Sequence, residues 1–306
     1  MRLRNLQSIR CNTASDRDSL VLGGDVLITC SNCGNQAAEH ETACECGNFL
    51  GYPNVRKALA ADEEQELLGR SQKAWAAADA IGARDRLAAF SDAILADSVA
   101  IVGRDLGTLD ALAKSDNVFY IGYHRQVRAG ARRPEENKWD AIRQQIDAAM
   151  FPNYFENILF ASLSLDGVGD TNYGLYFIRL RDNMIRMRAS VFEGNTIVFA
   201  DRHNLRLADP VPPGYRASWG ERHVLAVSKL HDQVSPSTEP ADFPTILFKP
   251  NSAGDAEFIE VHIYGNLGVS SIDAISGAVG NSPEDKILWR SVKRRLTARG
   301  IAVQER

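Results

Sequence analysis

The sequence lacks an apolar run long enough to cross a bilayer, and polar residues follow Met1-Arg2-Leu3-Arg4-Asn5 where a secretory signal would be apolar. It also lacks a glycine-rich phosphate loop, a serine-nucleophile elbow and the ligand spacing of a catalytic zinc site, which removes several common enzyme classes. Basic charge is not in excess: the 306 residues carry a net charge of -4, whereas a general nucleic-acid binder is normally strongly basic. We therefore expect a cytoplasmic protein without a membrane partner.

Cysteine is scarce, and its placement is informative. The five cysteines comprise one in a polar leader (residues 1–24), Cys11, and two close pairs, Cys30 with Cys33 and Cys44 with Cys46. A glycine follows each pair and permits the tight turn that brings backbone amides to thiolates. This spacing predicts a minimal zinc ribbon over residues 25–52 with a structural Zn²⁺, His40 being a substitute ligand; the alternative is a set of unrelated thiols. Cys11 is expected to be a passive thiol.

Residues 53–116 are predicted to form an α-helical connector, because Leu87, Phe90 and Ile94 recur with helical spacing. The acidic run Asp62-Glu63-Glu64 is interpreted as a solvated helix surface. From residue 117 to 306 short strands outnumber helices without regular βαβ alternation, which predicts a mainly antiparallel α+β domain. Expected strands include 118–124, 184–192 and 196–199, and a turn at 181–183 is expected to join the second of these in a hairpin to a strand at 175–180.

Residues Phe258 to Tyr264 form the strand of most interest. With a period of two, Phe258, Glu260, His262 and Tyr264 share one face, and Ile259, Val261 and Ile263 share the other. The first face therefore holds a carboxylate and an imidazole between two aromatic rings, an arrangement suited to stabilising a developing cation. The alternative is an edge strand with a polar outer face.

Several segments together resemble a set of bacterial toxin-like proteins related to the ADP-ribosyltransferase fold. Arg188-Ala189-Ser190-Val191-Phe192-Glu193-Gly194-Asn195-Thr196 is similar to their Arg-Thr-Thr-Phe-Thr-x-Gly-Asp-Ser stretch, and Tyr173-Gly174 to a Tyr-Gly ahead of it. Ile259-Glu260-Val261-His262-Ile263-Tyr264-Gly265 resembles their Ile-Glu-Ala-Gln-x-His-Gly, which an aliphatic-rich helix start follows, here Ser271. The similarity spans residues 118–280; Asn195, Thr196 and His262 depart from it.

The resemblance implies a split antiparallel sheet with NAD in the cleft between its halves. It implies that three strands supply the catalytic residues, here His124, Ser190 and Glu260. It further implies that NAD is held by Arg125, Tyr173, Arg188, His262 and Tyr264. Each of three of these residues also has a structural alternative: a surface position for His124, a hydrogen bond to a neighbouring strand for Ser190, and packing for Tyr173.

The expected chemistry follows from these side chains. Breaking the nicotinamide–ribose bond passes through an oxocarbenium-like state, which a carboxylate beside the ribose stabilises. Phe258 stands two residues before Glu260, where the superfamily has Glu or Gln for arginine-directed transfer. Its identity implies a different acceptor: a nucleic acid, another side chain, or water, the last making the protein an NAD glycohydrolase.

Two hypotheses of different classes result. The first is NAD-dependent ADP-ribosyl transfer to a macromolecular acceptor, nucleic acid or protein, by a toxin or defence effector; an inhibitor or antitoxin partner is compatible with it. The second is a non-enzymatic zinc-ribbon protein that binds nucleic acid or a protein partner. A local basic patch supports either: Arg125, Arg128, Arg132 and Arg133.

Overall fold

The computed structural model describes residues 27–130, 138–205, 209–249, 256–280 and 282–306. The leader with Cys11, and Arg132 and Arg133 of the basic patch, lie outside these residues. The α-helices described are α1 (Pro53–Ala58), α2 (Ala61–Ala80), α3 (Arg84–Asp97), α4 (Leu106–Lys114), α5 (Tyr123–Arg128), α6 (Lys138–Met150), α7 (Asp182–Ile185), α8 (Thr196–Arg202), α9 (Arg222–Leu230), α10 (Phe243–Leu247) and α11 (Pro283–Thr297). Short 3-10 turns are η1 (Phe155–Asn157), η2 (Thr171–Tyr173), η3 (His231–Gln233), η4 (Pro240–Asp242) and η5 (Val269–Ser271). The strands are β1 (Leu27–Thr29), β2 (Gln36–Ala38), β3 (Val99–Arg104), β4 (Phe119–Tyr120), β5 (Ile158–Ser164), β6 (Tyr176–Leu180), β7 (Ala189–Phe192), β8 (Arg216–Ser218), β9 (Glu260–Tyr264), β10 (Leu267–Gly268), β11 (Ile272–Gly277) and β12 (Ala302–Glu305).

One mixed sheet organises the larger part of the molecule. Its eight strands follow the order β12-β11-β6-β3-β5-β9-β7-β8. The β11–β12 pair is parallel, and the other neighbouring pairs are antiparallel. The prediction of a mainly antiparallel α+β architecture is therefore confirmed. The strands pair in one continuous order, so the split into two halves that the resemblance implies is not seen in the described part of the chain.

The two faces of the sheet differ in chemistry. Val261 and Ile263 lie opposite small and aliphatic residues of β5 and β7, and this face packs into the main core beneath α2, α3 and α9. On the other face, Glu260 is aligned with Ser162 and His262 with Phe160. A second cluster of buried rings, which includes Phe151 from beyond α6 and Phe199 from α8, covers part of this face. The alternation predicted for this strand is thus confirmed.

Three sequence-based assignments are wrong for local reasons. Residues 53–116 are not wholly helical, because Val99–Arg104 forms β3 between β6 and β5. Residues 118–124 yield only the two-residue β4, and His124 lies on α5. Residues 184–192 begin in the one-turn helix α7, and β7 pairs with β8 and β9 instead of forming a hairpin with β6.

Two further segments change type. Thr196 begins α8, because the Asn195 side chain accepts hydrogen bonds from the amides of Ile197 and Val198 as an N-cap. The expected helix start at Ser271 is instead the end of η5, and β11 follows it directly.

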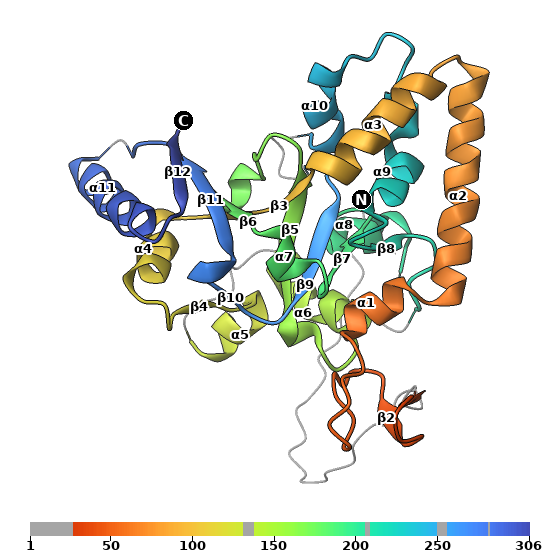
Figure 1. The fold of residues 1–306 in the computed structure, drawn as a ribbon, viewed down its shortest axis with the longest axis horizontal. Coiled ribbons are helices and arrows are strands. Elements are labelled where there is room, and N and C mark those ends of the chain that lie inside the picture. The colour runs from red at the N-terminus through yellow and green to blue at the C-terminus, as the bar shows by residue number, and fades with distance from the viewer. Residues whose placement is uncertain (1–26, 131–137, 206–208, 250–255, 281) are drawn as a thin grey trace, which may run out of the picture.

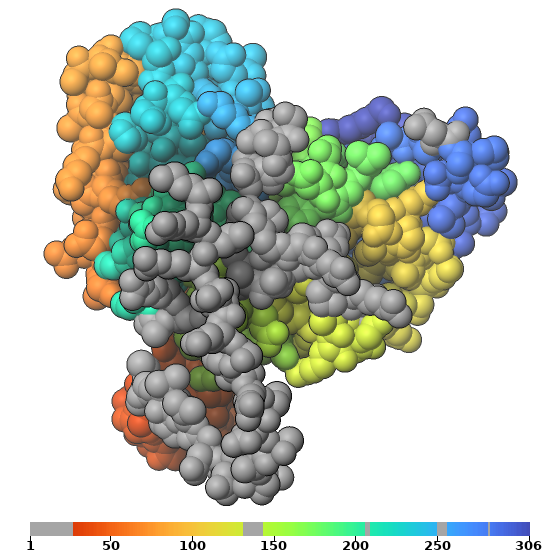
Figure 2. All heavy atoms as spheres, turned by 180° about the vertical axis from the view of Figure 1, so that it is seen from behind, coloured from red at the N-terminus to blue at the C-terminus, as the bar shows by residue number. Residues whose placement is uncertain are grey.

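The N-terminal module projects from the sheet (Figure 1, lower part). Strands β1 and β2 form an antiparallel hairpin, and α1 joins this module to β7, β8 and β9. Seen from behind, residues 27–52 remain a separate protrusion, drawn in red below the main body (Figure 2). None of the described helices is both long and apolar enough to span a membrane.

Candidate functional site

Strand β9 lies in the interior of the sheet, between β5 and β7. The alternative of an edge strand with a polar outer face is therefore wrong. Glu260 and His262 are almost fully buried, with 3% and 1% of their surfaces exposed. A carboxylate and an imidazole in such a position carry a desolvation cost, so their surroundings decide what they can do.

A pocket opens beside Glu260 on the polar face of the sheet. It encloses about 610 Å³ of empty space, part of which is open solvent. Segments far apart in the sequence line it, and their polar members include Tyr120, Tyr123, Arg143, Ser162, Tyr173 and Glu260. With Asp170 and Arg104, which also line it, the pocket combines two buried carboxylates, two guanidiniums and three phenol rings.

Glu260 is held from behind by His262. The His262 Nε2 lies 3.0 Å from Glu260 Oε2, and the imidazole is packed among the rings of Phe151, Phe160 and Phe192. Their ring centroids lie 4.8, 5.4 and 5.7 Å from that of His262. His262 is not among the described residues that line the pocket, so its contact with a ligand would be indirect. Its packing restricts the imidazole to one orientation, and the hydrogen bond does the same for the carboxyl.

Arg143 forms a wall of the pocket and is itself positioned by aromatic and acidic groups. Its guanidinium carbon lies 4.9 Å from the centre of the Tyr123 ring and 5.1 Å from that of Phe160. Its Nε lies 3.5 Å from Oδ2 of Asp147, which is fully buried one helical turn later. Cation–π contacts of this kind favour a fixed guanidinium over a mobile one.

His124 reaches this cluster from α5, away from the pocket itself. Its Nε2 lies 2.7 Å from Asp147 Oδ2, and Thr196 Oγ1 lies 3.4 Å from Oδ1 of the same carboxyl. Of the pair that begins α5, Tyr123 lines the pocket and His124 does not. The structure thus connects His124 to the pocket through Asp147 and Arg143.

Tyr173 occupies the mouth of the pocket, where it exposes 39% of its surface. Burial raises the pKa of its phenol, and the carboxylates of Glu260 and Asp170 raise it further. The Arg143 guanidinium acts in the opposite direction on the same pKa. These effects show that Tyr173, Arg143 and Glu260 are electrostatic neighbours.

Steric crowding explains why a glycine follows Tyr173. Gly174 has φ +133°, and a Cβ there would lie 2.2 Å from the backbone of Arg104 at the end of β3. Only glycine permits this approach, which brings η2 against β3. The Tyr-Gly pair noted in the sequence therefore places a tyrosine on the pocket wall.

Four of the residues assigned to NAD binding or catalysis lie outside the described pocket lining: Ser190 on β7, Arg188 just before it, Tyr264 at the end of β9, and Arg125 on α5. Ser190 Oγ accepts a hydrogen bond from Asn54 Nδ2 at 3.2 Å. Arg188 donates to the carbonyl of Tyr264 at 2.7 Å and to that of Asn266. The remaining two contact Asn157: the Tyr264 hydroxyl accepts from its Nδ2, and Arg125 donates to its Oδ1. Each of these contacts joins neighbouring elements of the fold.

Most residues of the pocket carry little signal in the sequence. Arg143 falls on a helix without a distinctive pattern, and Ser162 lies within an apolar strand. Tyr123 stands beside the histidine that was selected instead. Gly103 gives the one local signal, since a Cβ there would meet the Asp170 carbonyl at 2.9 Å. A glycine within an apolar run marks close approach of another backbone.

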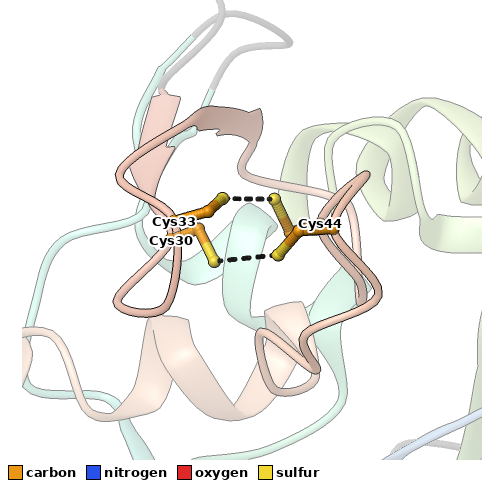
Figure 3. Close-up of side chains that lie close together, drawn as sticks. Cys30, Cys33 and Cys44 are labelled. Atoms are coloured by element: carbon orange, nitrogen blue, oxygen red, sulfur yellow. Dashed lines mark hydrogen bonds between the residues drawn. The ribbon is translucent and has the colours of Figure 1, made fainter.

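The four clustered cysteines converge as predicted. Their sulfur atoms all lie within 4.8 Å of one another, with 3.8 Å between Cys30 and Cys46 and 3.6 Å between Cys33 and Cys44. Figure 3 shows Cys33 and Cys44 facing one another and Cys30 beside them. Four thiolates bonded to zinc at about 2.3 Å in a tetrahedron have sulfurs separated by about 3.8 Å. The group is therefore positioned to bind a metal ion; His40 is not part of it.

Backbone N–H groups in the turns around the cysteines lower the pKa of all four thiols, but desolvation and contacts among the sulfur atoms leave the pKa of Cys33 raised to about 12 and that of Cys44 raised. Gly34 and Gly47 have φ values of +76° and +84°, as the turn after each pair requires. Backbone N–H groups of Cys33 and Asn32 lower the pKa of Cys30 to about 6. The Asn48 side-chain amide also donates to the Cys30 sulfur, at 3.6 Å.

Comparison with known proteins gives no further identification. No protein-family model matches this chain, and no curated protein sequence matches it.

Proposed function

We propose that the chain cleaves the nicotinamide–ribose bond of NAD in the Glu260 pocket and transfers ADP-ribose to a macromolecular acceptor or to water. One observation carries the proposal: a buried carboxylate, fixed by an imidazole, forms the wall of a pocket that also holds tyrosine rings and arginine. The order of motifs in the sequence, which resembles ADP-ribosyltransferase-like proteins, supplies NAD as the substrate.

Glu260 is assigned the stabilisation of the ribosyl cation. Positive charge develops on the ribose as the glycosidic bond lengthens, and a fixed carboxylate at the pocket wall stabilises that charge more than it stabilises neutral ground-state ribose. Nicotinamide leaves as a neutral molecule, so no acid is needed to protonate it. The hydrogen bond from His262 keeps the carboxyl in place while the bond breaks.

The other pocket residues are assigned to binding. Tyr173 at the mouth provides a ring on which nicotinamide stacks. Arg143 provides a guanidinium for the pyrophosphate, held in orientation by the Tyr123 and Phe160 rings. Phe258 also lines the pocket, so the position two residues before Glu260 offers no polar group to an arginine acceptor.

We also propose that the cysteine cluster holds a structural Zn²⁺. Its four ligands are all protein thiols, which closes the coordination sphere and leaves no position for a substrate. The chemistry of the chain is therefore assigned to the Glu260 pocket alone. We assign to the protruding module the recognition of the target, with the chain acting as a toxin or defence effector.

The test uses purified protein, NAD labelled in its adenylate part, and a cell lysate as the source of acceptors. Wild type should convert NAD and place label in protein, in nucleic acid, or in free ADP-ribose, which identifies the acceptor class. Glu260→Gln should lower turnover by about 10²–10³-fold, the loss typical of removing one preorganised electrostatic group. Glu284→Gln, on the exposed start of α11, is the matched control and should turn over normally.

Binding is measured separately from turnover. Saturating NAD should raise the melting temperature of wild type and of Glu260→Gln, because a ligand that binds only the folded state stabilises it. Absence of any shift in wild type, or undiminished turnover by Glu260→Gln, would overturn the proposal.

A further inference from the structure

The link between the cysteine module and strand β9 is unusually direct. Helix α1 has six residues and follows the module after Gly51 and Tyr52. Residues two apart on a helix point to nearly opposite sides, about 200° apart. Asn54 and Arg56 are such a pair, and each makes several hydrogen bonds in its own direction.

Arg56 faces the cysteine module. Its guanidinium donates to four backbone carbonyls, two at Glu39 and Glu41 between the cysteine pairs and two at Leu50 and Gly51 after the second pair. These carbonyls lie together only when the module is folded. A module of this size has too little core to fold alone, so its structure would depend on the metal proposed above for its cysteines.

Asn54 faces the sheet. It is 2% exposed, and its Nδ2 lies 3.0 Å from the carbonyl of His262, 3.1 Å from that of Arg188 and 3.2 Å from Ser190 Oγ. Ser190 and His262 are directly opposite on β7 and β9. One amide group therefore fastens two neighbouring strands at the residue whose imidazole holds Glu260.

We propose that Asn54 is a positioning residue that couples the metal centre to the Glu260 strand. In this proposal metal binding folds the module, and the folded module fixes the position of Arg56 and therefore of α1. The position of α1 in turn keeps the Asn54 amide in hydrogen-bonding contact with β7 and β9. The coupling is a property of the fold and stands without NAD; its effect on turnover rests on the function proposed above.

A buried asparagine is suited to this task because its amide is short and rigid. Its Oδ1 is buried with no hydrogen-bond partner in the described structure, so the residue bears the cost of an unsatisfied acceptor while its nitrogen makes the contacts. A leucine of similar volume would avoid that cost but could not hold the strands. The contacts of the nitrogen thus account for the residue type.

Hydrogen exchange of the full-length protein, with and without a metal chelator under reducing conditions, tests the coupling. In wild type, metal removal should speed amide exchange in β7 and β9 by about tenfold, a coupling of ordinary size between two sites. Exchange in α11, at the far end of the molecule (Figure 1), should not change. Asn54→Ala with metal bound should already show the faster exchange in β9, and metal removal should add less than about twofold.

Matched variants keep the test decisive. Asn117→Ala, at an exposed turn, should behave as wild type. Arg56→Lys retains the charge but not the fork of donors, and should give intermediate exchange even if Asn54→Ala fails to fold. Three results would overturn the proposal. The first is that metal removal does not change amide exchange in β9 of wild type; the second is that it speeds β9 exchange in Asn54→Ala as much as in wild type. The third is that metal removal speeds exchange in α11 as much as in β9.

Turnover separates this inference from the proposed function. With NAD as the probe, Asn54→Ala should lower kcat more than it raises KM, because it misplaces a group needed in the transition state. If Asn54→Ala raises KM and leaves kcat unchanged, the positioning role is overturned. If wild type does not cleave NAD, the proposed function fails, while the exchange measurements still decide the coupling.

Discussion

Replacing Glu63 should destabilise the protein far more than replacing either acidic neighbour. Glu63 lies in the first turn of α2, yet it is only 2% exposed. Its Oε1 accepts hydrogen bonds from three successive backbone amides, those of Gly214, Tyr215 and Arg216, at 2.9, 2.8 and 2.7 Å. Its Oε2 lies 3.3 Å from Nη1 of the buried Arg216. One carboxylate thus neutralises a guanidinium and orders the entry to β8.

The magnitude follows from what Glu63→Ala leaves behind. Removing one member of a buried ion pair costs about 3–5 kcal/mol, because the remaining charge stays desolvated and unpaired. Three amides also lose their acceptor, but they belong to the same disrupted site and are not added in full. We expect a loss of about 4 kcal/mol for Glu63→Ala. For Glu63→Gln we expect about half of this, since one oxygen can still accept.

Urea denaturation followed by tryptophan fluorescence measures the effect. Asp62→Ala and Glu64→Ala are the controls; both side chains are exposed, and each should cost about 0.5 kcal/mol through the helix dipole. The denaturant dependence should stay the same, so that the midpoint alone shifts. A cost for Glu63→Ala within 1 kcal/mol of the controls would refute the reasoning, because it would mean that the charge contributes nothing beyond a surface group.

Three other predictions concern separate parts of the molecule. Metal analysis should find about one zinc per chain, lost in Cys33→Ser but kept in Cys11→Ser; a metal-free wild type would contradict the assignment. Asp147→Asn should weaken NAD binding about tenfold in a calorimetric titration, because Arg143 loses its buried counter-charge; unchanged affinity would remove Asp147 from the site. Hydrogen bonds from Lys114, and from Arg295, lower the pKa of Asp110 below 3.8, so its stabilising contribution is present above that pH and is lost as pH falls further; Asp110→Asn should flatten this acid limb in denaturation measured from pH 5 to 2.

Local patterns predicted the parts of the structure that depend on local contacts. The cysteine cluster was predicted because all four ligands and both turn glycines lie within residues 30–47. The two faces of β9 were predicted because an interior strand of a sheet with unlike faces must alternate. Whether the cluster binds zinc, and whether Glu260 is catalytic, stay predictions.

The assignments that failed depended on distant partners. Nothing within Val99–Arg104 indicates that β5 and β6, some 60 and 75 residues later, flank it. Glu63 was interpreted as a surface residue because its charged neighbours are; the loop that buries it lies at residues 214–216. The signal for α8 was present, since Asn195 is a good N-cap, but the β-branched residues that follow favoured a strand.

The pocket shows the same limit more sharply. Of the residues assigned to the site from the sequence, only Tyr173 and Glu260 line it. Arg143, which also lines the pocket, lies on α6, and only tertiary packing brings this helix to the site. A resemblance carries motif positions between sequences, but it cannot supply a residue that lies outside the motifs.

Stability does not explain why the polar face of β9 is buried. A buried carboxylate and imidazole pay a desolvation penalty that a pair of aliphatic side chains would avoid, and such replacements are often neutral or stabilising by about 1–4 kcal/mol. The opposite face of the same strand, with Val261 and Ile263, shows that this chain can fill a core with aliphatic residues. His262 is enclosed by three aromatic rings and directed at Glu260, while Glu260 is directed at the pocket. The role proposed for the carboxylate, acting on a ligand in the pocket, would account for the cost of this arrangement.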